Sequence, residues 1–270
     1  MTTIDAYRGW QDDLYQLDAT LNLRLGGVSA PANVPVCFVR RHPSSLHMRL
    51  VFLVLAALLS GHVSAASTCF GTTSAGRLES ACNLPRTGKN FSTYSSILRA
   101  AGRTYLHCDV HKVMLDAYSS LETSNPDTVY VFGETGKKQG GLFNPHKTHQ
   151  NGLSVDFMIP VVDRNGASVP LPTSIINKYG YDIDFTVDGK YKNLTIDYEA
   201  FASHLAALGE SAKRNGVGIW RVIFDPKMQH ELKTTKAWPL ISHLTFSTRR
   251  SWVRHDDHYH VDFDVPCKPL

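Results

Sequence analysis

The sequence lacks the features of several large protein classes. Its longest apolar run, residues 50–59, has only half of the roughly 20 residues that a membrane-spanning helix needs. No charge of one sign dominates, because 28 Lys and Arg face 24 Asp and Glu, which argues against nucleic-acid binding. No glycine period, sustained heptad or longer repeat is present, so collagen, coiled-coil and solenoid classes are excluded. With 43% apolar residues, the chain can form a packed core.

Residues 48–65 have the anatomy of a secretory signal peptide. Met48 and Arg49 form a short positive start, an apolar stretch follows, and Val63-Ser64-Ala65 places small residues at the cleavage positions. A buried core helix would not explain those small residues. We therefore expect residues 66–270 to be the mature chain, periplasmic or secreted, with no stable membrane insertion after cleavage. Residues 1–47 are expected to be a non-native extension from an early start; the alternative is a genuine long leader.

Cysteine is scarce, and four of the five cysteines lie in the predicted mature chain: Cys69, Cys82, Cys108 and Cys267. None of them forms the C-x-x-C spacing of a redox or zinc site, so in an exported protein we expect two structural disulfides. Three pairings are possible, and the spacing does not decide between them. One of them joins Cys69 to Cys82 and ties Cys108, in an early helix, to Cys267 near the C-terminus.

Helical and strand patterns without a βαβ rhythm predict an α+β fold, with a central, mostly antiparallel sheet flanked by helices in a single domain. Apolar spacing indicates helices at 103–121 and 198–215, the second capped by Asp197, and partial helix within 226–245. Alternation and β-branched residues indicate strands at 128–133, 153–162, 218–224 and 258–265. The dipeptide Asp188-Gly189 predicts a hairpin within 181–196.

Histidine stands out, because five of the ten histidines in residues 66–270 fall in two short segments. The residues of these segments that could bind a metal or move a proton are His146, His149, Asp156, His255, His258 and His260. In a strand, residues i and i+2 share a face, so His258 and His260 are expected to lie side by side. Two imidazoles and one carboxylate make a zinc site with an open fourth position, as in hydrolytic zinc enzymes. A lone histidine is more often a surface or core residue, but this clustering favours a metal site.

The two segments also resemble a known family. GGLFNPHKTHQNGLSVDFMIP (residues 140–160) and RHDDHYHVDF (residues 254–263) are similar to the signature segments of the penicillin-insensitive murein endopeptidases. These belong to the zinc peptidases that include lysostaphin-type enzymes, D-alanyl-D-alanine peptidases and the hedgehog zinc domain. The resemblance therefore implies a hedgehog/DD-peptidase-like domain. Residues 160–215 show no clear similarity.

Carried over residue by residue, the resemblance implies a zinc ion held by His149, Asp156 and His260. It implies that His258 is the general base or stabilises the transition state. His146 and His255 would flank the metal, where they would orient water or bind the developing oxyanion.

Three acidic residues, Asp256, Asp257 and Asp262, surround the second segment. One of them is expected to hold a ligand imidazole through its second nitrogen; alternatively, the three form a solvated acidic turn.

The function that the resemblance implies is that of an exported zinc-dependent murein endopeptidase. Its partner would be peptidoglycan, and its substrate would be a cross-link such as the D-alanyl to meso-diaminopimelyl bond. One alternative is a D,D-carboxypeptidase or another cell-wall peptidase on the same scaffold. Another is a non-catalytic zinc-binding module, but a structural zinc site has four closed ligands, and the additional histidines argue against it. The sequence leaves the oligomeric state open.

Overall fold

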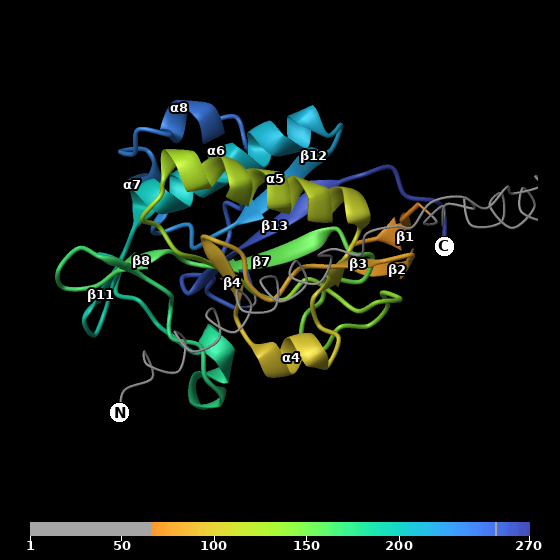
Figure 1. Cartoon of the computed structure of the whole chain (residues 1–270), viewed down its shortest axis with the longest axis horizontal. Helices are drawn as coiled ribbons and strands as arrows, with labels where there is room; N and C mark the ends of the chain where they lie inside the picture. Colours follow the sequence, from red (N-terminus) through yellow and green to blue (C-terminus); the bar gives the residue numbers. More distant parts are fainter. Residues whose placement is uncertain (1–65, 252) are drawn as a thin grey trace, which may run out of the picture. The chain divides into compact units, whose positions relative to one another are not determined.

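The computed structural model describes residues 66–251 and 253–270, which fall in one compact unit of the chain (Figure 1). The predicted signal peptide at 48–65 and the predicted extension at 1–47 lie outside the described residues. Within the described ranges, no helix is long and apolar enough to cross a membrane. The described residues all lie within the predicted mature chain, residues 66–270.

A five-stranded sheet forms the centre of this unit, with the strand order β12-β13-β7-β6-β4. The strands are β4 (Phe91–Thr93), β6 (Tyr130–Phe132), β7 (Ser154–Met158), β12 (Gly218–Ile223) and β13 (His258–Asp264). All neighbours in the sheet are antiparallel except β4 and β6. The predicted α+β class is confirmed, and each predicted strand segment contains one of β6, β7, β12 and β13.

Two long helices, α5 (Cys108–Ser124) and α6 (Tyr198–Arg214), lie together over one face of the sheet (Figure 1). Helix α6 begins where predicted, because the Asp197 carboxylate accepts a hydrogen bond from the Ala200 N–H at 2.9 Å, which satisfies a donor that the helix leaves free. Phe201 of α6 packs on Tyr259 of β13, with ring centroids 4.2 Å apart. The apolar core therefore lies between these helices and the sheet, and the polar residues of β7 and β13 occupy the opposite face.

The remaining elements are short. Strands β1 (Thr68–Thr72) and β2 (Ala75–Glu79) pair, as do β3 (Cys82–Asn83) and β5 (Tyr105–Leu106). A four-stranded sheet has the order β10-β11-β8-β9, formed by β8 (Val161–Val162), β9 (Ser168–Val169), β10 (Lys190–Tyr191) and β11 (Leu194–Ile196). The short helices are α4 (Ser96–Ala100), the 3-10 helix η1 (Ile175–Gly180), α7 (Gln229–Leu232) and α8 (Trp238–Ile241). Helices α7 and α8 confirm the partial helix predicted within 226–245.

The strand predicted at 153–162 is divided between two sheets. Strand β7 ends at Met158, although the N–H of the next residue, Ile159, still donates to Asp257 O at 2.9 Å, in register with the pairing of β7 and β13. Pro160 has no N–H to offer to a neighbouring strand. Strand β8 then resumes in the four-stranded sheet, so Pro160 marks the point where the chain leaves the central sheet.

The hairpin predicted within 181–196 is present, but its turn is not the predicted one. Strands β10 and β11 are joined through residues 192–193 and not through Asp188-Gly189. Gly189 does lie in a turn, with a φ of +73°. The residues before that turn form no strand, because the buried Phe185 donates its N–H to the Asp256 carboxylate and not to a neighbouring strand.

The disulfide pairing that joins Cys69 to Cys82 is wrong. Cys69 is bonded to Cys267, and Cys82 is bonded to Cys108. The C-terminal segment runs beside β1, where Lys268 donates its N–H to the carbonyl of Cys69, and this places Cys267 next to Cys69. The pairing of β3 with β5 brings Cys82 to the start of α5, where Cys108 lies.

Candidate metal centre

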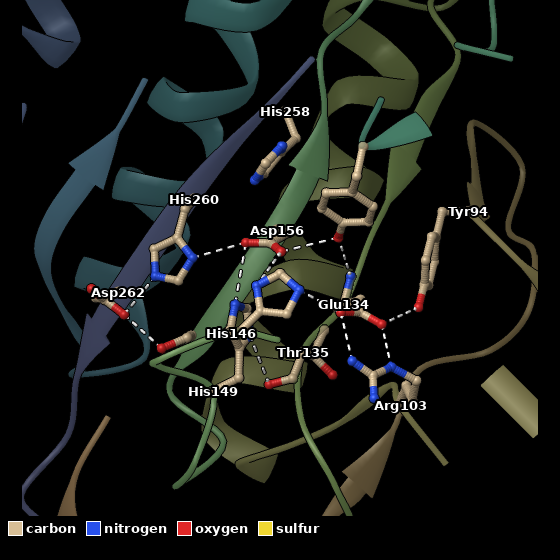
Figure 2. A network of polar contacts seen from close by, with 12 residues as sticks. Tyr94, Arg103, Glu134, Thr135, His146, His149, Asp156, His258, His260 and Asp262 are labelled. Carbon is tan, nitrogen blue, oxygen red and sulfur yellow. Dashed lines mark hydrogen bonds and ion pairs between the residues drawn. The ribbon is translucent and has the colours of Figure 1, made fainter. Parts of the chain in front are cut away.

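Two neighbouring strands bring Asp156 and His260 together. In the antiparallel pairing of β7 and β13, Asp156 is opposite His260 and Met158 is opposite His258. His260 Nδ1 lies 2.8 Å from Asp156 Oδ1 (Figure 2). Tyr259 points to the other face and packs on α6. The predicted alternation is therefore confirmed, and His258 and His260 share the face that lies away from α5 and α6.

His149 reaches the same place from the loop that precedes β7. The loop turns back at Gly152, whose φ of +76° is a conformation that glycine adopts without strain. A Cβ atom there would lie 2.8 Å from the backbone nitrogen of His107, so the turn leaves no room for a side chain. The His149 imidazole is fully buried, and its Nε2 lies 3.3 Å from Asp156 Oδ1. Its ring centroid is 4.8 Å from that of His260.

The donor set of His149, Asp156 and His260 fits a zinc ion, because zinc accepts imidazole nitrogens and carboxylate oxygens as ligands. Both His149 Nε2 and His260 Nδ1 lie close to Asp156 Oδ1. His149 Nε2 is buried and, although it lies 3.3 Å from Asp156 Oδ1, it makes no hydrogen bond of good geometry to a described residue. Such unpaired buried atoms are rare in native proteins, and an ion would satisfy this one.

Outer contacts hold both histidines by their second ring nitrogen. His149 Nδ1 lies 3.3 Å from Thr135 O, and His260 Nε2 lies 2.8 Å from Asp262 Oδ1. Carbonyl and carboxylate groups orient metal-binding histidines in this way. Asp262 thus contacts the second ring nitrogen of His260, while the ligand role of that imidazole stays a prediction. The solvated acidic turn is wrong for Asp262, which is fully buried.

The electrostatic environment favours a positive charge at this position. Burial lowers the pKa of His149, which favours the neutral imidazole that binds metals. Burial alone would raise the pKa of Asp156, but the neighbouring histidines His149 and His258 hold that pKa well below its usual range. Burial alone would lower the pKa of His260, but Asp262 and Asp156 outweigh it and raise this pKa to about 10. The carboxylates thus favour a cation among these residues.

His146 lies beside this set and offers another donor. One ligand atom from each of His146, His149 and Asp156 lies within 4.8 Å of the others, and His146 Nδ1 is 3.8 Å from Asp156 Oδ2. The second ring nitrogen of His146, Nε2, lies 2.6 Å from Glu134 Oε2. Two candidate sets of three ligands therefore share His149 and Asp156, and they differ in whether His146 or His260 completes them.

His258 and His255 complete the group, with ring centroids 4.6 Å apart. The Asp257 carboxylate is hydrogen-bonded to His258 Nδ1, which leaves Nε2 for other partners. Burial alone would lower the pKa of His258, but the charges of Asp257 and Asp156 outweigh this effect, and the pKa is raised above its ordinary value. Burial lowers the pKa of His255 to about 3, so this imidazole is neutral at physiological pH. The fold brings together all six residues that the sequence selects.

A cleft of about 600 Å³ adjoins these residues. Its walls include His146, His258 and Glu134, and also Tyr179 and Tyr181 from the segment that shows no clear sequence similarity. A smaller hollow of about 190 Å³ is lined by His146, His255, His260 and Arg221. Because both hollows are lined by His146 and Val253, they adjoin each other at the histidine group.

Sequence reasoning missed Glu134, Arg103 and Tyr181. The Tyr181 hydroxyl donates to Asp156 Oδ2 at 3.0 Å and accepts the Glu134 N–H at 3.1 Å, and the Arg103 guanidinium pairs with the Glu134 carboxylate. These residues come from three separate segments without a motif spacing to either histidine segment. The one available signal is that Glu134 directly follows the predicted strand at 128–133.

Comparison with known proteins agrees with this geometry. No curated protein matches the chain. The family model described as penicillin-insensitive murein endopeptidase matches residues 69–269, a range that includes both histidine segments, all four disulfide-bonded cysteines and the segment at 160–215. The chain belongs to the penicillin-insensitive murein endopeptidase family.

Proposed function

We propose that this protein is an exported, zinc-dependent murein endopeptidase that hydrolyses D-alanyl to meso-diaminopimelyl cross-links of peptidoglycan. The observation that carries the proposal is the convergence of His149 Nε2 and His260 Nδ1 on one carboxylate oxygen of Asp156, in a chain of the murein endopeptidase family. We propose His149, Asp156 and His260 as the zinc ligands. A carboxylate holds the second ring nitrogen of both His260 and His146. His260 is preferred because its Nδ1 lies 2.8 Å from an Asp156 carboxylate oxygen, whereas Nδ1 of His146 lies 3.8 Å from one.

Zinc held there would polarise the scissile carbonyl and supply a hydroxide nucleophile at neutral pH. The surrounding side chains transfer the proton and orient the reacting groups. His258 accepts the proton of the attacking water at Nε2, because Asp257 engages Nδ1, and returns it to the leaving amine. His146 and His255 line the hollows on the substrate side, where they orient the attacking water and the scissile peptide.

The shape of the site supports an endopeptidase. A carboxypeptidase needs room for a single terminal residue beyond the scissile bond, whereas a cross-link extends in both directions from it. The larger hollow and the smaller one meet at His146, so peptide can occupy both sides of the histidine group. Two disulfides support export, since they persist in oxidising compartments, and the proposed signal peptide at 48–65 would direct it.

Digestion of cross-linked sacculi tests the activity and the bond. Residues 66–270 are incubated with purified sacculi, with and without a chelator, and the released muropeptides are identified by mass. The expected result is chelator-sensitive loss of dimers with a matching gain of monomers. Release of free D-alanine without loss of dimers would instead identify a carboxypeptidase. Intact sacculi after treatment with folded, zinc-loaded protein would contradict both activities and favour a binding module.

Two matched histidine variants test the ligand assignment. His260→Ala and His146→Ala each remove one imidazole beside Asp156, and the zinc content of each purified protein is measured by mass spectrometry. We expect His260→Ala to lose the metal and His146→Ala to retain it with reduced turnover. The opposite result would exchange their roles and make His146 the third ligand.

A further inference from the structure

Glu134 is a buried carboxylate at the wall of the cleft. It follows β6 directly and is 4% exposed, yet it contributes to the lining of the larger hollow. Acidic residues are rarely buried to this degree unless they are paired. Neither histidine segment contains Glu134, and the roles proposed above do not use it.

The side chain of Glu134 is held from three directions (Figure 2). Arg103 forms two hydrogen bonds to it, one of them from Nη2 to Oε2 at 2.9 Å. The Tyr94 hydroxyl donates to Oε1 at 2.8 Å, and His146 Nε2 lies 2.6 Å from Oε2. Burial alone would raise the pKa of Glu134, but hydrogen bonds and charges from Arg103 and His146 outweigh this effect, and the pKa is lowered to about 2. The carboxylate is therefore an anion and accepts hydrogen bonds from all three partners.

The backbone of the same residue is tied to the proposed metal ligand. The Glu134 carbonyl accepts the Asp156 N–H at 2.9 Å, and the Glu134 N–H donates to the Tyr181 hydroxyl, which donates in turn to Asp156 Oδ2. Glu134 thus contacts Asp156 through its main chain and His146 through its side chain. These contacts fix the separation between the two functional groups.

Stability alone is a weak reason for such an arrangement. The cost of removing charges from water often cancels what a buried ion pair gains, and an apolar replacement is frequently as stable. The arrangement does have a geometric consequence, since a ring held at Nε2 presents Nδ1 on its other side. In His146 that atom is the one 3.8 Å from Asp156 Oδ2.

We propose that Glu134 is the positioning residue of His146: together with Arg103 and Tyr94, it holds the imidazole by Nε2 so that Nδ1 is directed at the reacting groups. The inference rests on the proposed function, in which His146 acts on the substrate. The carboxylate of Glu134 lines the cleft but takes no part in bond formation or proton transfer. Its effect on catalysis passes entirely through His146.

A double-mutant cycle tests this dependence. Glu134→Gln keeps the size of the side chain and removes its charge, and it is measured alone and combined with His146→Ala. We expect Glu134→Gln to lower kcat on cross-linked muropeptides by 10- to 100-fold, with KM and zinc content within twofold of the unchanged protein. In the His146→Ala background we expect it to change kcat by less than twofold. Equal losses in both backgrounds would overturn the proposal, because they would show an effect that does not pass through His146.

Two further variants keep the test decisive. Glu122→Gln removes the charge of a surface glutamate that pairs with Lys89 at 3.4 Å, and we expect no change in kcat. If Glu134→Gln does not fold, Tyr94→Phe removes one hydrogen bond to the carboxylate without altering charge. For Tyr94→Phe we expect a two- to tenfold lower kcat, and no effect once His146 is absent.

A spectroscopic readout separates this proposal from the proposed activity. Long-range ¹⁵N–¹H NMR spectra report which ring nitrogen carries the proton, and the signal of His146 is identified by its loss in His146→Ala. We expect a proton on Nε2 in the unchanged protein and its displacement in Glu134→Gln. An unchanged His146 spectrum in Glu134→Gln would overturn the positioning role. An inactive protein that still shows the expected shift would refute only the proposed reaction.

Discussion

His260 Nδ1 lies 2.8 Å from Asp156 Oδ1 because the two residues are register partners of β13 and β7. Cross-strand partners are held at a fixed separation by the sheet itself, so this pair needs no loop to position it. His149 is the exception, since it joins the pair from a loop that closes at Gly152. Two of the three proposed ligands are therefore placed by the pairing of two central strands.

Asp262→Asn is expected to weaken zinc binding by 10- to 100-fold, the usual cost of losing an outer-shell contact. Asp262 Oδ1 lies 2.8 Å from His260 Nε2 and accepts a hydrogen bond from the Ser154 hydroxyl at 2.6 Å. The amide of asparagine carries no negative charge beside His260 and has one oxygen in place of two to accept hydrogen bonds. Competition with a chromogenic chelator measures the affinity. Asp264→Asn, at the exposed end of the same strand, is the control, and equal affinities for both variants would contradict the expectation.

His258→Ala is expected to abolish turnover while leaving zinc bound. Loss of a general acid and base costs about 10²–10⁴ in rate, and His258 is absent from both candidate ligand sets. The measurements are muropeptide release and metal content in the same preparation. His230→Ala, which removes an imidazole that is mostly exposed, should change neither. Loss of zinc from His258→Ala would show that ligand and base are exchanged.

Contacts between residues that are close together in the sequence could be predicted from it. The i, i+2 relation of His258 and His260 depends only on strand geometry, and the cap at Asp197 depends on one side chain and the next turn of helix. The six histidine-segment residues meet because each segment includes a strand and the two strands pair.

Partners from distant segments could not be predicted in this way. Glu134, Arg103 and Tyr181 meet at the site through the packing of separate elements. The disulfide pairing could not be predicted for the same reason, because Cys69 and its partner Cys267 are separated by 198 residues. Phenylalanine favours strands, but the N–H of Phe185 donates a hydrogen bond to the Asp256 carboxylate. This tertiary contact overrides the local preference.

His204 is expected to make the protein less stable as the pH falls from neutrality. It is fully buried on α6, and burial lowers its pKa to about 3, whereas in the unfolded chain the pKa is about 6.5. Between these values the unfolded state binds a proton that the folded state does not, so stability decreases with falling pH by up to about 1.4 kcal/mol per pH unit.

Unfolding of the zinc-loaded protein by urea at several pH values between neutral and weakly acidic measures this slope. His204→Phe removes the titrating group, although it also removes the hydrogen bond between His204 and Tyr259. The absolute stability of the variant therefore falls, but we expect its pH slope to be smaller than that of the unchanged protein. His230→Ala should keep the original slope. A slope unaffected by His204→Phe would assign the acid sensitivity to other groups.

The two disulfides are expected to differ in their contribution to stability. In the chain-entropy account, a cross-link that closes a longer loop restricts the unfolded chain more. The Cys69–Cys267 bond spans 198 residues and the Cys82–Cys108 bond spans 26, which correspond to about 5 and about 3.5 kcal/mol in that account. We therefore expect Cys69→Ser/Cys267→Ser to unfold at a lower urea concentration than Cys82→Ser/Cys108→Ser at fixed zinc. The reverse order would show that native packing near Cys82 outweighs the effect on the unfolded chain.

The pairing itself can be checked on the same preparations, because trypsin sites separate the four cysteines. Arg77 lies between Cys69 and Cys82, and Arg103 lies between Cys82 and Cys108. Non-reducing digestion should release one linked pair that contains Cys69 with Cys267 and another that contains Cys82 with Cys108. A linked peptide that joins Cys69 to Cys82 would contradict the fold at β1, since the C-terminal segment is hydrogen-bonded beside that strand. The expected stability difference between the two double variants would then have to be recalculated from the loops that the observed disulfides close.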